Sequence, residues 1–135
     1  MSTPLRILIV DDYPDALEVW ALFLGAEGFE VLTAANGHEA LAHAISARPD
    51  MVVMDIQLPG LSGLEVAREL RRSPSTRHIP LIAATGLSHT TQITEARSAG
   101  FDAVLVKPCS PDVLIAEIRR LLAESGRKPA SDNHS

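Results

Sequence analysis

Met51-Val-Val-Met-Asp-Ile-Gln-Leu-Pro-Gly60 begins as an apolar run typical of a buried strand, and Asp55 ends that run. A carboxylate is costly to bury unless another group pairs with it. No basic residue lies near Asp55 in the sequence. We therefore expect Asp55 to be either a turn residue or part of a site that the fold assembles from distant segments.

Short apolar segments alternate with helical patterns along the rest of the chain. Segment length and β-branched residues predict strands, while apolar spacing and capping residues predict helices. The expected strands are residues 5–10, 30–34, 51–54, 79–84 and 103–106. The expected helices begin near Pro14, Asn36, Ser62, Ser88 and Ser110 and end near Gly28, Ala47, Arg72, Gly100 and Gly126. This alternation predicts an α/β fold, with a parallel sheet covered by helices on both faces.

The composition narrows the class of protein. A chain of 135 residues is long enough for one domain with a real core. Its net charge of -5 argues against direct binding of nucleic acid. Cys109 is the only cysteine, which excludes an internal disulfide and fits a cytoplasmic location; we interpret it as a small, partly buried residue. No segment approaches the roughly 20 apolar residues of a membrane helix, so no membrane contact is expected.

Polar residues follow four of the expected strands. Asp11 and Asp12 follow the first strand and Asp55 the third, while Thr85 and Lys107 lie at the ends of the fourth and fifth. Each has a plain structural explanation when taken alone: the first two as a helix cap, Asp55 as a turn acid and Lys107 as a loop residue. The carboxyl ends of parallel strands meet at one edge of the sheet. Their joint placement therefore favours a site.

Three carboxylates at one edge repel one another unless a cation lies between them. Mg²⁺ prefers such oxygen ligands and keeps several waters. A carboxylate beside it is a competent nucleophile toward a phosphoryl group. Lys107 and the Thr85 hydroxyl could neutralise the phosphoryl oxygens. Asp55 directly follows an apolar strand that would hold it rigidly, so we predict that Asp55 is the acceptor.

Four segments of the chain match a known family in order and spacing: Ile7-Leu-Ile-Val-Asp-Asp12, Val52-Val-Met-Asp-Ile-Gln-Leu-Pro-Gly60, Ala83-Ala-Thr85 and Lys107-Pro108. From about Leu5 to Leu122 the chain resembles the CheY-like receiver domain of bacterial two-component response regulators. The resemblance implies a flavodoxin-like three-layer sandwich with five helices and a five-stranded parallel sheet in the order 2-1-3-4-5. It places the receiver domain at residues 5–123, and we expect the polar tail, 124–135, to be disordered.

The resemblance also implies a chemistry and a set of partners. Asp55 would accept a phosphoryl group from a phosphohistidine of a histidine kinase or a histidine phosphotransfer protein. Asp12 and Asp55 would ligate Mg²⁺, with Asp11 helping through water and the backbone carbonyl of Gln57 completing the set. Thr85 and Lys107 would then contact the phosphoryl group.

Phosphorylation would repack the surface of the fourth helix, fifth strand and fifth helix for a downstream target protein. Dimer formation through that surface stays open. The domain would not be an enzyme beyond slow self-phosphorylation and dephosphorylation. The chain departs from the family at Val104, where an aromatic residue often tracks the threonine.

Several alternatives stay open at the level of the sequence. We expect a stand-alone receiver, but the chain could be excised from a hybrid histidine kinase or a larger regulator. It could also be a pseudo-receiver that is never phosphorylated. A phosphohydrolase is disfavoured because Gln57 stands where those enzymes have a second acid. A nucleotide or flavin binder is disfavoured because no glycine-rich phosphate loop follows the first strand.

Overall fold

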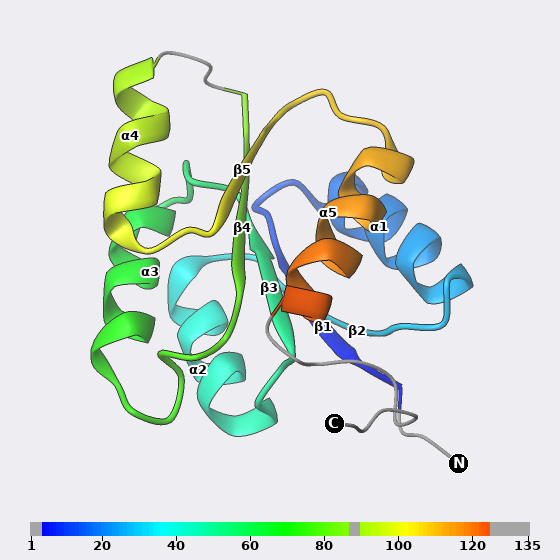
Figure 1. Cartoon of the computed structure of the whole chain (residues 1–135), viewed down its shortest axis with the longest axis horizontal. Helices are drawn as coiled ribbons and strands as arrows, with labels where there is room; N and C mark the ends of the chain where they lie inside the picture. The colour runs from blue at the N-terminus through cyan, green and yellow to red at the C-terminus, as the bar shows by residue number, and fades with distance from the viewer. Residues whose placement is uncertain (1–3, 87–89, 125–135) are drawn as a thin grey trace.

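The computed structural model describes residues 4–86 and 90–124, in which strands and helices alternate (Figure 1). The strands are β1 Arg6–Val10, β2 Glu30–Ala34, β3 Met51–Met54, β4 Leu81–Thr85 and β5 Ala103–Val106. The helices are α1 Pro14–Ala26, α2 Gly37–Ala47, α3 Gly63–Arg72, α4 Thr90–Ala99 and α5 Pro111–Glu124. The element types and their order are as predicted.

The strands form one parallel sheet in the order β2-β1-β3-β4-β5. Helices α1 and α5 cover one face of the sheet, while α2, α3 and α4 cover the other (Figure 1). This is the three-layer, flavodoxin-like sandwich expected from the sequence. The register pairs Val10 with Met54 and Thr85 with Val106, so the strands end at a common edge.

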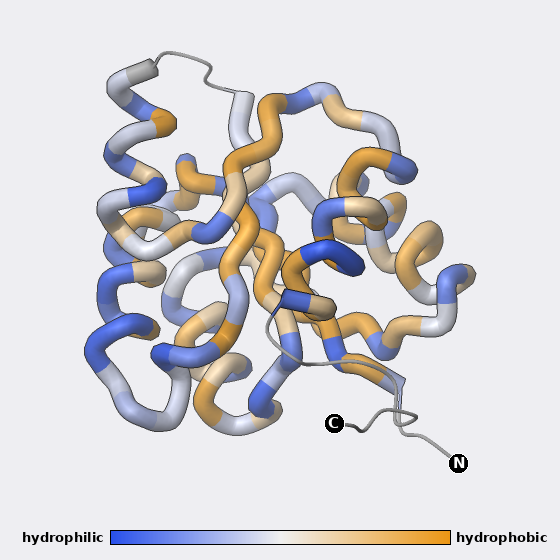
Figure 2. Tube along the Cα trace, viewed as in Figure 1, coloured by the Kyte–Doolittle hydropathy of each residue, from blue (hydrophilic) through white to orange (hydrophobic). Residues whose placement is uncertain are grey.

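Two hydrophobic clusters hold the layers together, one on each face of the sheet. Leu8 and Val10 of β1 belong to the cluster that includes residues of α2, α3 and α4. Ile7 and Ile9 belong to the cluster that includes residues of α1 and α5. The apolar segments run through the middle of the molecule (Figure 2). Burying each large aliphatic side chain contributes about 1.5–3 kcal/mol, so the sheet is a firm base for the residues at its edge.

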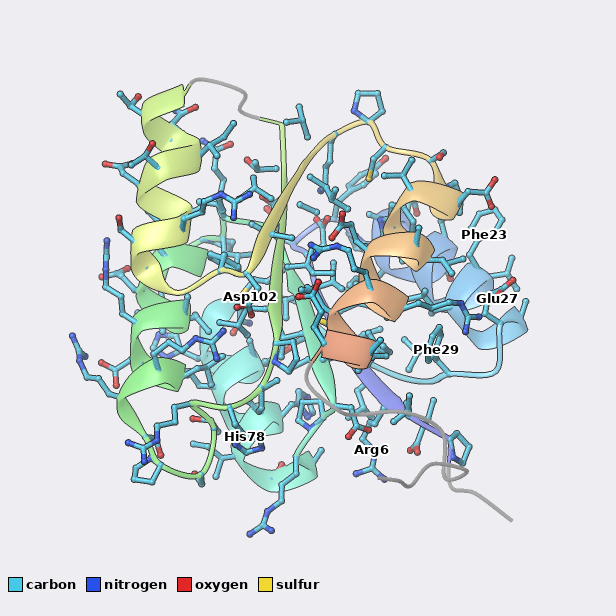
Figure 3. The ribbon with its side chains drawn as sticks, in the orientation of Figure 1. Arg6, Phe23, Glu27, Phe29, His78 and Asp102 are labelled. Carbon is cyan, nitrogen blue, oxygen red and sulfur yellow. The ribbon has the colours of Figure 1, made fainter. Side chains whose placement is uncertain are left out.

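Arg119 of α5 contacts the loop between α1 and β2. Its Nη2 lies 2.8 Å from Glu27 Oε1, and its guanidinium carbon lies 5.3 Å from the centre of the Phe29 ring. Figure 3 labels both partners beside α5. The ion pair is exposed and contributes little to stability, so the buried cluster shared by α1 and α5 determines how these helices pack.

Three of the predicted helix caps are present. Ser110 Oγ accepts from the Val113 amide at 3.4 Å, at the start of α5. Asn36 accepts a hydrogen bond from the Glu39 amide at 2.9 Å. Ser62 and Glu65 form a reciprocal capping box at the start of α3. The Ser88 cap and the tail after Glu124 lie outside the described residues. Within the described ranges, no helix is long and apolar enough to span a bilayer.

The structure excludes one alternative and corrects one strand boundary. Asp11 and Asp12 do not cap α1, because its N-cap is Tyr13, without a side-chain cap. Strand β4 begins at Leu81 rather than at Ile79. The Ile79 amide instead donates to the Thr76 carbonyl at 3.0 Å, which closes the turn before the strand.

Candidate functional site

Asp11 is the first residue after β1 and is almost fully buried. Its amide donates to the Ala34 carbonyl at 3.1 Å, which extends the pairing with β2. Its Oδ1 accepts from the Tyr13 amide at 3.0 Å, and its Oδ2 accepts from Lys107 Nζ at 2.6 Å. Both carboxylate oxygens therefore have fixed partners.

Asp55 directly follows β3, and its amide donates to the Val10 carbonyl at 3.0 Å. Its Oδ1 accepts from the Gln57 amide at 3.0 Å, and its Oδ2 lies 3.3 Å from Lys107 Nζ. The side chain keeps 15% of its surface exposed. Asp55 is thus held in one orientation but stays within reach of a group arriving from outside.

Gly63 packs directly against the backbone of Asp55 and Ile56. Its amide donates to the Ile56 carbonyl at 2.8 Å. A Cβ at this position would lie 2.5 Å from the Asp55 carbonyl oxygen and 2.8 Å from the Ile56 Cα. Only a residue without a side chain lets α3 begin so close to the strand end. This role of Gly63 was not predicted from the sequence. The one signal for it there is a glycine directly after the Ser62 cap.

Asp12 completes the carboxylate cluster and is exposed. One oxygen from each of Asp11, Asp12 and Asp55 lies within 4.8 Å of the others. The structure therefore brings together three acids that the sequence separates by up to 44 positions.

Lys107 is the cation that the sequence around Asp55 lacks. It follows β5, and its amide donates to the Thr85 carbonyl at 2.7 Å, which continues the β4–β5 pairing. Partial burial acts to lower the pKa of Lys107, but the hydrogen bond to Asp11 and the attraction of Asp55 outweigh it and raise that pKa. The ammonium group is therefore charged at neutral pH and faces both carboxylates.

The remaining candidates lie around this cluster. Thr85 ends β4 and is 1% exposed. Gln57 is exposed in the loop after β3 and holds Asp55 through its amide. Val104 pairs with Ala83 and packs against the cluster on the α2–α4 face. An aliphatic side chain thus occupies the place on β5 where the sequence comparison expected an aromatic ring.

The donor set fits a hard divalent cation. Asp11, Asp12 and Asp55 offer carboxylate oxygens from two strand ends, close enough for one ion to contact all three. Mg²⁺ takes oxygen ligands at short distances and keeps part of its water shell, so a partly open cluster suits it. No cysteine or histidine belongs to this group, which argues against softer metals.

Comparison with known proteins agrees with this arrangement. The family model for the response regulator receiver domain matches residues 7–119. The DNA-binding response regulator MtrA of Mycolicibacterium smegmatis is 34% identical over 125 residues, which are 93% of this chain and 54% of that protein. The chain therefore spans about half the length of that relative.

Two solved structures show the same fold. Chemotaxis protein CheY4 of Vibrio cholerae superposes with a TM-score of 0.85 at 31% identity, covering 89% of this chain and 100% of that one. The receiver domain of the sensor histidine kinase PA1611 of Pseudomonas aeruginosa superposes with a TM-score of 0.83 at 30% identity. The match covers 90% of this chain and 99% of that one. That domain was solved with a magnesium ion coordinated in its active site cleft.

Proposed function

The chain belongs to the response regulator receiver domain family of two-component signalling, and we propose that Asp55 is its phosphoacceptor. The observation that carries this is the position of Asp55, which is held by the Gln57 amide, faces Lys107 Nζ and stays partly exposed. The phosphodonor would be a phosphohistidine of a histidine kinase or of a histidine phosphotransfer protein. Membership of the family supports a phosphoacceptor over the phosphohydrolase and the nucleotide-binding alternatives.

The proposed step moves one phosphoryl group between two protein side chains. An oxygen of the Asp55 carboxylate donates an electron pair to phosphorus and forms the new P–O bond. The P–N bond to the imidazole breaks, and its electrons return to the ring nitrogen. Asp55 becomes an acyl phosphate, and the partner histidine leaves as a free imidazole that takes up a proton from water.

The other residues hold and balance charge in this step. Asp11, Asp12, Asp55 and the Gln57 backbone carbonyl would hold Mg²⁺, which when bound neutralises negative charge on the phosphoryl oxygens. Lys107, which follows β5 at the same edge of the sheet, contributes a second positive charge. The Thr85 hydroxyl would donate to the phosphoryl group from the end of β4.

We further propose that the output is a protein–protein contact through α4, β5 and α5. Val106 on β5 and Val113 on α5 are apolar yet exposed, which supports a contact surface here. Whether a dimer also forms on this surface is left to experiment. The same proposal holds for a stand-alone receiver in the cytoplasm and for the receiver part of a longer regulator or hybrid kinase.

The direct test is intact-mass spectrometry after incubation with acetyl phosphate, with Mg²⁺ or with EDTA. We expect one added phosphoryl group on the wild type in Mg²⁺ and none in EDTA. Asp55→Asn should not be labelled. Asp15→Asn is the matched control, because Asp15 is an exposed carboxylate on α1 outside the cluster. Equal labelling of Asp55→Asn and the wild type would contradict the proposal, and no labelling with any small donor would favour a pseudo-receiver.

A further inference from the structure

A pocket of about 510 Å³ lies beside the carboxylate cluster, between the β3–α3 loop and α4. It is separate from the cluster but shares Asp12 with it. Its lining comes from the loops after β1 and β3, the start of α3 and one face of α4. The lining residues are Asp12, Ile56, Gln57, Leu58, Pro59, Ser62, Leu64, Gln92 and Glu95.

Gln92 is the most informative of these residues. Its Oε1 is buried, and no donor among the described residues reaches it. A buried acceptor without a partner costs free energy comparable to a lost hydrogen bond, so native proteins rarely keep one without a reason. A group that enters the pocket with an N–H donor would remove this cost.

The charge of the pocket indicates which donor fits. Glu95 supplies an exposed carboxylate outside the carboxylate cluster, Asp12 adds one that it shares with the cluster, and none of the described lining residues is basic. Glu95 lies three residues after Gln92, so both project from the same face of α4. The pocket therefore offers acceptors and negative charge, which suit a cation that carries several N–H groups.

The apolar walls of the pocket narrow the class of cationic ligand further. Ile56 and Leu58 are apolar and nearly fully buried, and Leu64 and Pro59 add apolar surface. An arginine side chain combines an aliphatic stem for such walls with five N–H donors in a planar fork. One guanidinium can donate to a buried amide oxygen and to carboxylates on its other edges, which a bare metal ion or a single ammonium cannot do as fully.

We propose that this pocket receives an arginine side chain of the protein that docks over Asp55. The identity of that partner rests on the proposed function, but the pocket and its chemistry do not. A protein that presents a group to Asp55 must cover Asp12, which is also a wall of the pocket. An arginine in the pocket would hold the partner in register beside the reacting carboxylate.

The test is an NMR titration of the ¹⁵N-labelled full chain in saturating Mg²⁺. The probe is Nα-acetyl-arginine amide, and its uncharged isostere Nα-acetyl-citrulline amide is the control ligand. We expect the arginine probe to shift the Gln92 side-chain amide signal, with a dissociation constant on the order of 1–10 mM for a single side chain. The citrulline probe should bind at least about tenfold more weakly.

Variants locate the binding and protect the test against unfolding. Gln92→Leu and Glu95→Gln should each weaken the arginine probe about 3- to 10-fold, whereas Thr91→Ala and Glu18→Gln, both at exposed positions, should not. Gln92→Leu should not lower the melting temperature, because it removes an acceptor that no donor among the described residues reaches. Equal binding of citrulline, or equal affinity in the pocket variants and the wild type, would overturn the inference.

Labelling by acetyl phosphate separates the two proposals. Gln92→Leu and Glu95→Gln should accept a phosphoryl group at the wild-type level, since neither residue belongs to the carboxylate cluster. Loss of probe binding with normal labelling would contradict only the pocket. Normal probe binding without labelling of the wild type would contradict only the proposed function.

Discussion

Lys107 contacts two carboxylates, and the shorter contact is with Asp11 rather than with Asp55. The distances from Nζ are 2.6 Å and 3.3 Å. A phosphoryl group on Asp55 would add negative charge close to Nζ and compete with Asp11 for it. At the scale of single residues, the site therefore contains a cation whose present partner can be exchanged.

The pKa of the Cys109 thiol tests the electrostatic effect of Lys107 on its neighbours. Burial raises the pKa of the Cys109 thiol, and the charge of Lys107 offsets part of that rise. We expect iodoacetamide to alkylate Cys109 more slowly at neutral pH than it alkylates N-acetyl-cysteine amide, because less thiolate is present. The rate should increase with pH, with a midpoint above the ordinary thiol value.

Replacing Lys107 with methionine should move that midpoint further upward, since the offsetting charge is gone. Arg120→Met removes an exposed cation on α5 and should leave the midpoint unchanged. A faster reaction in Lys107→Met with unchanged circular dichroism would contradict the electrostatic explanation.

At the scale of elements, the start of α3 and the end of β3 depend on each other. Gly63→Ala would place a Cβ 2.5 Å from the Asp55 carbonyl oxygen, so the strand end or the helix must shift. We expect a loss of about 1–3 kcal/mol in the free energy of unfolding and slower labelling by acetyl phosphate. Urea unfolding and intact-mass kinetics measure the two effects.

Gly25→Ala is the matched control for this prediction. Gly25 is the penultimate residue of α1, and a Cβ there would meet no described atom within 4 Å. Alanine in the last helical turn should stabilise by up to about 0.5–1 kcal/mol and leave the labelling rate unchanged. If the two variants behaved alike, the contact between Gly63 and the Asp55 backbone would have no importance for the site.

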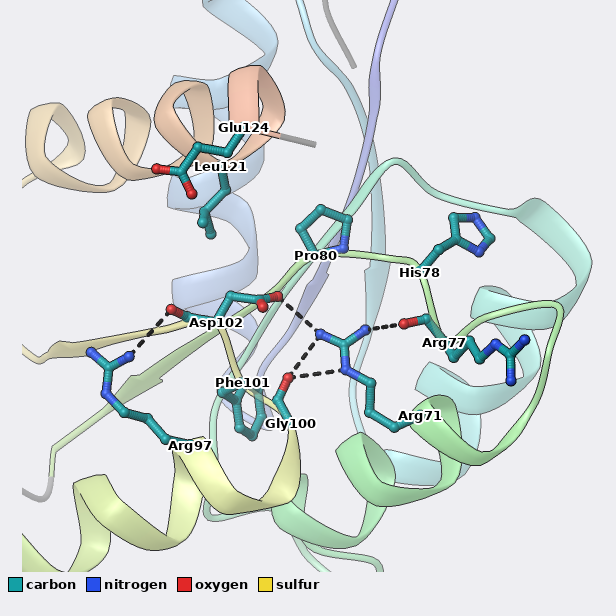
Figure 4. A pocket seen from close by; sticks show the side chains of 10 residues that line it. All are labelled: Arg71, Arg77, His78, Pro80, Arg97, Gly100, Phe101, Asp102, Leu121 and Glu124. Atoms are coloured by element: carbon teal, nitrogen blue, oxygen red, sulfur yellow. Dashed lines mark hydrogen bonds and ion pairs between the residues drawn. The ribbon is translucent and has the colours of Figure 1, made fainter. Parts of the chain in front are cut away.

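Arg71 joins four elements far from the carboxylate cluster. Its guanidinium donates to the carbonyls of Arg77 and Gly100 and to Asp102 Oδ2 (Figure 4). It also donates to the Ile79 carbonyl at 2.6 Å. These contacts connect the end of α3, the turn before β4, the end of α4 and the start of β5. Asp102 Oδ2 also accepts from the Leu81 amide at 2.8 Å, so the network reaches the sheet itself.

Arg71→Ala should therefore lower the free energy of unfolding by about 2–4 kcal/mol, because four acceptors, two of them partly buried, lose their donor. The neighbouring Arg72 is exposed and pairs with Glu69 one turn earlier on the same helix. Arg72→Ala should change stability by less than about 0.5 kcal/mol. Urea unfolding of both variants makes the comparison, and equal losses would show that Arg71 is not a structural hub.

Arg71 also shows where sequence reasoning stops. In the sequence, Arg71 stands beside Arg68 and Arg72 and looks like one more residue of a solvated basic helix face. Its partners Gly100 and Asp102 lie 29 and 31 positions away, so no local pattern reveals them. Similarly, nothing in the sequence indicates that Gln92 Oε1 finds no donor within residues 4–86 and 90–124.

The residues that follow the strands were easier to place from the sequence than Arg71, for a physical reason. In a parallel sheet every strand points the same way, so a residue after one strand lies near a residue after the next. That rule alone brings Asp11, Asp55 and Lys107 to one edge. It does not give distances, and it could not show which carboxylate lies nearer to Lys107.

For the molecule as a whole, the carboxylate cluster should link metal binding to folding. A cation that binds only the folded chain stabilises it, by about 2.7 kcal/mol when its concentration is one hundred times the dissociation constant. We expect Mg²⁺ to raise the melting temperature of the wild type in calorimetry. Asp12→Asn should lose most of this rise, while Asp15→Asn should keep it. An equal rise in both variants would mean that Mg²⁺ acts elsewhere.

The central claim is that Asp55 alone carries the phosphoryl group, and borohydride mapping tests it most directly. Borohydride reduces an acyl phosphate to an alcohol, which converts a phosphorylated aspartate to homoserine that peptide mass spectrometry can locate. After incubation with acetyl phosphate and Mg²⁺, the account predicts homoserine at position 55 and nowhere else. Homoserine at position 11 or 12 instead would contradict it.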